Sequence, residues 1–155
     1  MMDSQLYREN ILDHYKRPRN RGKIEKPSSS AHDSNPLCGD DISMSISVKS
    51  GKISDVKFEG TACAICLASA SMLTEEVRGK GVEASRKVGK ERVLALLGID
   101  PGPTRLKCAL LPLKAFKLAL YSHLGKKMGE EEEREIEEAD EGAVVGQAAD
   151  EEAGK

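Results

Sequence analysis

Four cysteines are the residues of this chain best suited to chemistry, because a thiolate binds soft metal ions and attacks sulfur. They are Cys38, Cys63, Cys66 and Cys108. The sequence opens without an export signal, so we expect metal ligands or reactive thiols instead of structural disulfides. Each cysteine is expected where a helix or strand begins or ends, outside the positions that hydrophobic periodicity would bury. Cysteines in separate loops can converge on one site.

Asp40 is the natural oxygen ligand to accompany these thiolates, since it follows Cys38 by two residues across a glycine. One oxygen and three sulfurs complete a four-coordinate zinc site. A hard oxygen is less well matched to iron or cuprous copper than a fourth thiolate would be. Such a site is expected to release its metal, as a transient carrier must and a structural zinc site does not.

Cys63 and Cys66 also form a C-x-x-C pair, which is the spacing of a redox dithiol. A thioredoxin-like pair is expected inside a βαβ unit, whereas an antiparallel hairpin is predicted before this one. A zinc ribbon would need a second C-x-x-C pair, whereas Cys108 stands alone. Both alternatives are therefore less favoured, and any single cysteine could instead be a small buried apolar residue. Metal binding by the histidines is not expected, because His32 and His123 lack ligand spacing and His14 is predicted on the polar side of the first helix.

Hydrophobic periodicity predicts the first elements that would position these residues. Apolar side chains at helical spacing predict a helix over residues 4–15, with His14 on its polar side, and residues 17–30 are expected to form an exposed loop. Strict alternation of apolar and polar residues predicts a strand over 42–49. Residues 53–59, with Val56 and Phe58 on one face, are expected to return as a second strand in an antiparallel hairpin. The first strand would start just after Cys38 and Asp40.

Three helices are predicted in the second half of the chain. The first follows Cys63 and ends near Gly79, and a shorter one covers residues 91–97. The last helix is expected to begin directly after Cys108, with Pro112 tolerated in its first turn. Cysteines just before helices would lie beside backbone N–H groups that stabilise negative charge.

The charges are divided unevenly along the chain. Residues 129–155 carry 12 acidic and two basic residues, a net charge of −10, which leaves the body with +8. We expect one domain over residues 1–128 and an acidic, disordered tail over 129–155. No apolar run is long enough for a membrane span, so a cytoplasmic protein is expected. With no Trp, two Phe and three Tyr, nucleic-acid binding is disfavoured, and the basic body fits an acidic protein partner.

Several motifs resemble those of the U-type iron–sulfur cluster assembly scaffold family, which includes IscU, SufU and the N-terminal domain of NifU. In chain order they are Leu6-Tyr7, Asp13-His14-Tyr15, Pro18-Arg19-Asn20, Asn35-Pro36, Cys38-Gly39-Asp40, Phe58-Glu59-Gly60, Cys63, Ala68-Ser69-Ala70-Ser71 and Lys107-Cys108-Ala109. Together they span about residues 4–126. The three separated cysteine motifs, in the right order, make the resemblance specific.

The resemblance implies an α+β fold, with helices on one face of a small antiparallel sheet and the metal or cluster site at one end. It also implies a scaffold without an enzymatic activity of its own. A cysteine desulfurase would deliver persulfide sulfur, a transient [2Fe–2S] or [4Fe–4S] cluster would form, and apo-proteins or carriers would receive it. The implied ligands are Cys38, Asp40, Cys63 and Cys108, with Cys108 as the sulfur acceptor. Zn²⁺ would occupy the cluster-free site, and a bridging cluster would join two chains as a homodimer.

The chain departs from the family pattern at four places, and the first two bear on the subgroup. Lys107 stands where IscU-like members have a histidine ligand, as in SufU-like members, which are zinc-dependent sulfurtransferases. The segment between Cys63 and Cys108 is nevertheless too short for the insertion typical of SufU, so both functions stay open. Residues 100–105 replace the proline-rich chaperone motif of IscU-like members. Cys66 stands where the family usually has a small polar residue, and it could compete with Asp40 as a fourth thiolate.

Overall fold

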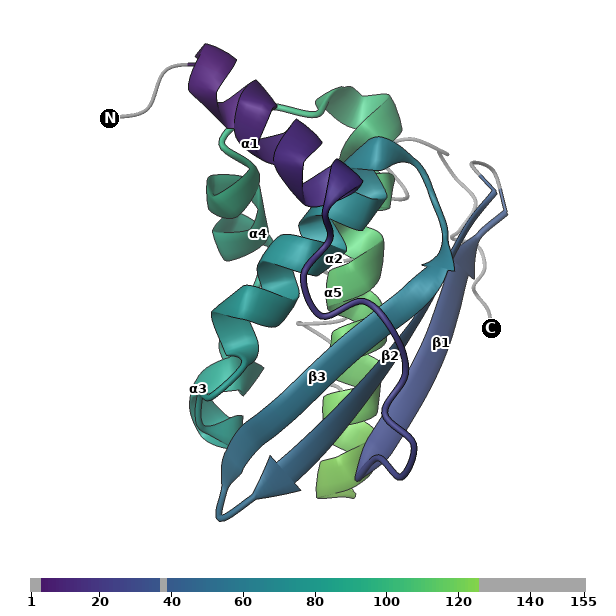
Figure 1. The fold of residues 1–155 in the computed structure, drawn as a ribbon, viewed down its shortest axis with the longest axis vertical. Helices are drawn as coiled ribbons and strands as arrows, with labels where there is room; N and C mark the ends of the chain where they lie inside the picture. Colours follow the sequence, from purple (N-terminus) through teal and green to yellow (C-terminus); the bar gives the residue numbers. More distant parts are fainter. Residues whose placement is uncertain (1–3, 37–38, 126–155) are drawn as a thin grey trace, which may run out of the picture.

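A three-stranded antiparallel sheet forms one layer of the molecule, and helices form the other (Figure 1). The computed structural model describes residues 4–36 and 39–125. In sheet order the strands are β1 (Ser29–Asn35), β2 (Asp40–Lys49) and β3 (Lys52–Thr61). Helices α2 (Ala64–Val77) and α5 (Gly102–Leu124) pack on one face of this sheet. The predicted α+β class is therefore confirmed.

Strands β2 and β3 pair as a hairpin in which buried side chains on one face alternate with more exposed ones on the other. Ile42, Met44 and Ile46 are at most 1% exposed and face the helices, because every second residue of a strand points to the same side. The turn lies at Ser50 and Gly51, which both have positive φ angles, as short hairpin turns require. The strands predicted over 42–49 and 53–59 are confirmed, with a few more residues at their ends.

Strand β1 was not predicted, because its seven residues include only one apolar side chain. The predicted loop over residues 17–30 thus ends earlier than expected. Backbone pairing with β2 holds the strand, and its inner side chains reach α5: the Ser29 hydroxyl donates to the Ala119 carbonyl at 2.7 Å, and Asp33 pairs with Lys114 at 3.7 Å. These are polar contacts, which a hydrophobic pattern does not reveal.

The remaining helices are α1 (Ser4–Lys16), α3 (Val82–Arg86) and α4 (Lys90–Leu97). The predicted helices at 4–15, after Cys63 and at 91–97 correspond to α1, α2 and α4. Helix α3 has five residues, too few for helical periodicity to show.

Helix α5 begins at Gly102, six residues before Cys108, and the predicted start was wrong. The helix begins within the segment expected to be a turn. The Asp100 carboxylate accepts the Gly102 N–H at 2.9 Å, and Pro103 is tolerated in the first helical turn. Pro112 therefore lies inside the helix. It has no N–H to donate to the carbonyl of Cys108, four residues earlier.

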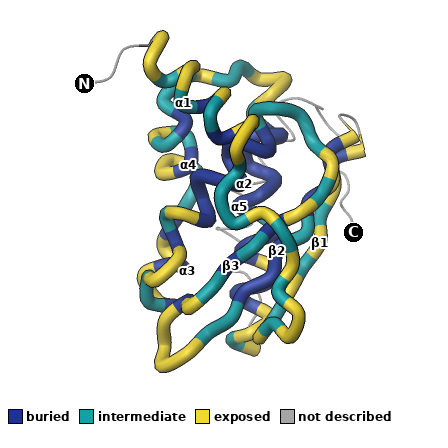
Figure 2. The backbone as a smooth tube through the Cα atoms, in the orientation of Figure 1, coloured by how far each residue is buried: buried dark blue, intermediate teal, exposed yellow. Residues whose placement is uncertain are grey.

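The core lies between the sheet and the helices. Figure 2 shows that many of the residues of α2 and α5 are buried there. Helix α2 carries the small residues Ala68, Ser69, Ala70 and Ser71, all buried, which allow other helices to approach closely. The Ser69 hydroxyl donates to the Ala109 carbonyl of α5 at 2.7 Å. This contact fixes the relative position of α2 and α5.

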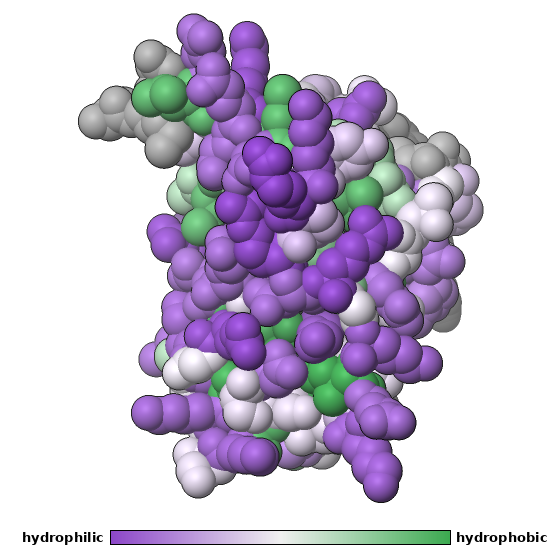
Figure 3. Space-filling view, in the orientation of Figure 1, coloured by the Kyte–Doolittle hydropathy of each residue, from purple (hydrophilic) through white to green (hydrophobic). Residues whose placement is uncertain are grey.

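The face shown in Figure 3 is mainly hydrophilic, and hydrophobic residues appear on it only in separate spots. The exposed large apolar side chains among the described residues include Leu12 and Tyr15 of α1 and Leu118 of α5. Among the described helices, none has both the length and the apolar character needed to cross a bilayer.

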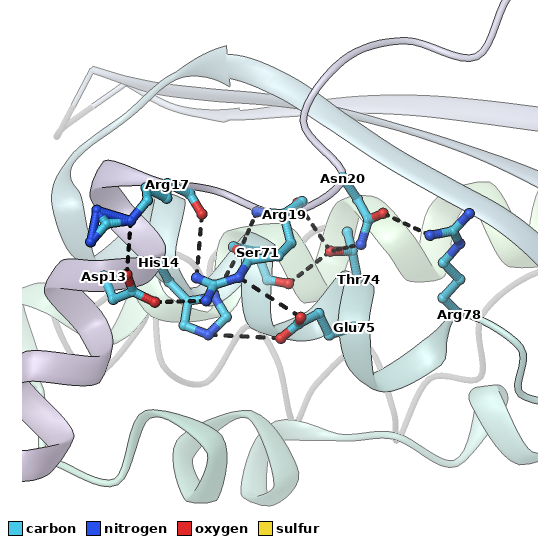
Figure 4. Close-up of polar contacts among 9 residues, drawn as sticks. All are labelled: Asp13, His14, Arg17, Arg19, Asn20, Ser71, Thr74, Glu75 and Arg78. Atoms are coloured by element: carbon cyan, nitrogen blue, oxygen red, sulfur yellow. Dashed lines mark hydrogen bonds and ion pairs between the residues drawn. The ribbon is translucent and has the colours of Figure 1, made fainter.

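A buried polar network fastens α1 to α2 (Figure 4). His14 is 5% exposed and lies on the inner side of α1, so its predicted place on the polar side was wrong. Its Nδ1 lies 2.7 Å from the Ser71 hydroxyl, which also accepts the Arg19 N–H at 2.9 Å. The Nε2 atom of the same ring faces the Glu75 carboxylate at 3.7 Å. Arg19 also binds Asp13 at 2.6 Å.

This network predicts a loss of stability as the pH falls. Burial, followed by the nearby Arg19 charge, lowers the pKa of His14 below its usual 6.5, although Glu75 and Asp13 act in the opposite direction. The unfolded chain therefore binds a proton at His14 before the folded chain does, and the stability present above pH 6.5 is lost below it. We expect the free energy of unfolding in urea to be highest well above pH 6.5 and to drop as the pH falls below it.

The comparison variant is His14→Gln, which keeps a neutral hydrogen-bonding group and should flatten this pH dependence. Hydrogen bonds from Arg19 to Asp13 and from Arg92 to Glu76 lower the pKa values of these carboxyls below 3.8 and 4.5, so both titrate at lower pH. Equal slopes for the two proteins would show that His14 does not cause the effect.

Candidate metal centre

Asp40, Cys63 and Cys108 meet at one end of the sheet, although they come from three different elements. Asp40 is the first residue of β2, Cys63 directly precedes α2, and Cys108 lies in the second turn of α5. One carboxylate oxygen and the two sulfurs all lie within 4.8 Å of one another. Within residues 4–36 and 39–125, this is the one group of three or more such side chains close enough to hold a metal ion.

The Asp40 carboxylate is fixed by the chain that carries Cys63. It is 2% exposed, and its Oδ1 accepts the backbone N–H of Cys63 at 3.0 Å. Its Oδ2 lies 3.7 Å from the Cys63 sulfur, whose thiol can donate to it. The hydrogen bond orients the carboxylate toward the sulfur, so both donors are positioned before a metal arrives.

Gly60 allows β2 and β3 to approach each other beside this pair. Its φ of +145° suits glycine, and a Cβ atom there would lie 1.9 Å from the backbone oxygen of Asp41. Its carbonyl also accepts a hydrogen bond from the Arg21 guanidinium at 3.1 Å. The Phe-Glu-Gly motif was noted in the sequence, but its steric role was not predicted, because the approach involves the neighbouring strand.

Cys108 is 1% exposed, because α5 starts well before it and carries it into the core. The prediction that it lies outside buried positions was therefore wrong. Lys107 beside it is also buried. A reactant can therefore reach the Cys108 sulfur only if the segments that cover it move.

Cys66 and Cys38 stand apart from this group for different reasons. Cys66 lies in the first turn of α2 and is 0% exposed, so its expected place outside buried positions was also wrong. It is not part of the three-residue group, and its role as a fourth thiolate stays a prediction. Cys38 lies outside the described residues, and its role as a ligand stays a prediction too.

The donors fit a metal that accepts both sulfur and oxygen. Zinc in proteins binds cysteine thiolates at about 2.3 Å in a tetrahedron, which separates two sulfurs by about 3.8 Å. Ligand atoms within 4.8 Å reach this spacing with a small contraction. Iron of a cluster also takes thiolate ligands, and the carboxylate supplies the harder, more easily exchanged donor. The arrangement can hold a thiophilic ion and release it.

Comparisons with known proteins identify the family of this chain. Residues 6–130 match the family model described as "NifU-like N terminal domain". The chain is 38% identical to the zinc-dependent sulfurtransferase SufU of Bacillus subtilis over 137 residues, covering 77% of this chain and 92% of that protein. It is 35% identical to the iron–sulfur cluster assembly scaffold protein IscU 1 of Archaeoglobus fulgidus over 121 residues, covering 78% of each.

Solved structures show the same fold. A crystal structure described as a scaffold protein for the SUF system, from Fervidobacterium islandicum, matches with a TM-score of 0.66 and 30% identity, over 76% of this chain and 99% of that one. The N-terminal part of a NifU-like protein from Brucella abortus matches in fold, with a TM-score of 0.65 over 78% and 96% of the two chains and 20% identity. The chain therefore belongs to the NifU-like N-terminal domain family, together with the IscU and SufU proteins.

Proposed function

We propose that this chain is a scaffold for iron–sulfur cluster assembly. It accepts persulfide sulfur from a cysteine desulfurase at Cys108, holds a transient [2Fe–2S] or [4Fe–4S] cluster as its cargo, and transfers it to apo-proteins or carriers. The proposed ligands are Cys38, Asp40, Cys63 and Cys108. The observation that carries this proposal is the meeting of Asp40, Cys63 and Cys108 at the end of the sheet.

The mixed donor set supports a carrier more than a structural metal site. A structural zinc site is usually closed by cysteine and histidine ligands alone. Here a carboxylate takes part, and it already accepts the N–H of Cys63, so it has a hydrogen-bond partner when the metal has left. A site that keeps its polar groups satisfied when empty suits repeated loading and release.

A second function is a zinc-dependent sulfurtransferase that accepts sulfur from the same kind of desulfurase. Two observations favour it: the 38% identity to the Bacillus SufU, and Lys107 directly before Cys108. In this function Zn²⁺ is held by the same residues, and exchange of one cysteine ligand makes Cys108 available to attack a persulfide. Both functions place sulfur on Cys108.

Metal and sulfide analysis of protein purified without oxygen separates the two functions. For a scaffold we expect iron and acid-labile sulfide, together with charge-transfer absorption in the visible spectrum. For a sulfurtransferase we expect tightly bound zinc without sulfide. Zinc protein that gains iron and sulfide when supplied with desulfurase, cysteine and iron is a scaffold isolated in its zinc form. Zinc protein that gains neither contradicts the scaffold.

The setting proposed for this function is the cytoplasm, whose reducing conditions keep thiols available. The proposed partners are the desulfurase and recipient proteins, and no nucleic acid or membrane takes part. The proposed domain boundary lies at residues 128 and 129, and the acidic segment 129–155 lies outside the described residues. A cluster shared between two chains would make a homodimer.

A further inference from the structure

The C-x-x-C pair of Cys63 and Cys66 has a second thiol that the metal centre does not account for. Cys63 is the N-cap residue of α2 and half-buried, whereas Cys66 is the third residue of the helix and fully buried. Helix α2 has 14 residues and directly follows β3. A more accessible cysteine at the start of a helix, followed by a buried one in its first turn, is the arrangement that redox dithiols use.

The backbone geometry suits a bond between these two cysteines. Residues three apart on a helix have Cβ atoms about 5–6 Å apart, and a disulfide needs about 3.5–4.5 Å. Cys63 is not itself helical, since its φ and ψ are −71° and 168°. Its carbonyl accepts the Leu67 N–H at 2.9 Å and its N–H is held by Asp40, so the two sulfurs approach by rotation of the cysteine side chains.

Cys63 is also the neighbour of the proposed sulfur acceptor. Its sulfur lies within 4.8 Å of the Cys108 sulfur. A persulfide adds one sulfur at a bond length of about 2.05 Å, which brings the outer sulfur within reach of Cys63. Cys63 therefore lies next to Cys108 in space and three residues before Cys66 in the chain; Cys66 and Cys108 belong to one buried cluster, and Cys63 packs against it.

We infer that Cys63 and Cys66 form a dithiol that reduces persulfide sulfur on this protein to sulfide, with Cys66 as the resolving thiol. This inference deepens the proposed function and rests on its delivery of sulfur to Cys108. Persulfide sulfur must gain two electrons before it has the oxidation state of cluster sulfide. The dithiol supplies both electrons from within the chain.

The reaction balances in two exchange steps. First, the Cys63 thiolate attacks the outer sulfur of the Cys108 persulfide; a bond forms between them, and Cys108 leaves as a thiolate. Next, the Cys66 thiol gives its proton to water and its sulfur attacks Sγ of Cys63, while the outer sulfur leaves with the bonding electrons as HS⁻. The two cysteines are oxidised to a disulfide. An external dithiol, such as a reduced thioredoxin-type protein, restores them.

The test follows sulfide release from the metal-free full chain under argon. Wild type, Cys66→Ala and a control, Ser54→Ala in the distant hairpin, are loaded with glutathione persulfide, freed of donor and kept without reductant. We expect wild type and control to release sulfide, and Cys66→Ala to release it about tenfold more slowly and keep its persulfide. Trypsin should release residues 58–78 of wild type as one peptide. A disulfide between Cys63 and Cys66 makes this peptide two hydrogens lighter than its reduced form.

The peptide analysis decides the question even if Cys66→Ala folds poorly, because it needs only wild type. A disulfide between Cys63 and Cys108, which links peptide 58–78 to peptide 108–114, would overturn the inference. Equal sulfide release from a folded Cys66→Ala, or no release from loaded wild type, would overturn it as well. A parallel loading with desulfurase and cysteine tests the proposed function separately, since failure there leaves the glutathione persulfide result unaffected.

Discussion

Cys108→Ser is expected to abolish sulfur uptake from a cysteine desulfurase, with a loss of about 100-fold or more. Serine is similar in size and keeps α5 intact, but its hydroxyl does not form a persulfide. The measurement supplies desulfurase and labelled cysteine and counts bound sulfur and released sulfide together. Both are counted because sulfur that Cys108 passes to Cys63, and that then leaves as sulfide, would be missed if bound sulfur alone were measured.

The matched control is Ser122→Ala, an exposed position near the end of the same helix. It should take up sulfur at the wild-type rate. Uptake by Cys108→Ser at a rate similar to the control would mean that Cys63, the more exposed thiol, receives sulfur directly. Cys108 would then be a ligand alone, and the proposed acceptor would be wrong.

Gly60→Ala is expected to disrupt the metal centre and destabilise the fold by about 2–4 kcal/mol. The added Cβ would lie 1.9 Å from the Asp41 oxygen, and an alanine is strained at a φ of +145°. Because Asp41 follows Asp40 in β2, relief of the clash should move the carboxylate away from the Cys63 N–H. Urea unfolding measures the stability, and zinc titration with a competing chelator measures the site.

Gly22→Ala separates the steric clash from backbone strain. Gly22 has a similar φ of +139°, but its added Cβ would meet only the Lys57 side chain at 3.7 Å, an ordinary contact. It should lose stability through strain while keeping its affinity for zinc. Equal zinc affinity for Gly60→Ala and Gly22→Ala would contradict the positioning role of Gly60.

The hairpin shows how far sequence patterns reach. Apolar and polar residues alternate from Ile42 to Lys49 in β2, and Val56 and Phe58 keep the same period in β3, so both strands are visible in the sequence. The polar strand β1 lacks this signal, because it is held by backbone pairing and by contacts of Ser29 and Asp33 with α5. Likewise the sequence predicts His14 on the polar side of α1. The structure buries it instead, because its ring forms a hydrogen bond with the Ser71 hydroxyl of α2. Both errors arise from partners distant in the chain.

The sequence by itself determined the hairpin of β2 and β3, the helices α1, α2 and α4, the cysteines with Asp40 as candidate ligands, and the family motifs, because periodicity and residue chemistry are local properties. Only the tertiary structure brought Asp40, Cys63 and Cys108 within 4.8 Å, buried Cys108 and Cys66, and gave Gly60 its steric role. These features depend on how β2, α2 and α5 pack together. A hydrogen bond such as that from the Cys63 N–H to Asp40 joins residues 23 positions apart, and packing alone decides that they meet.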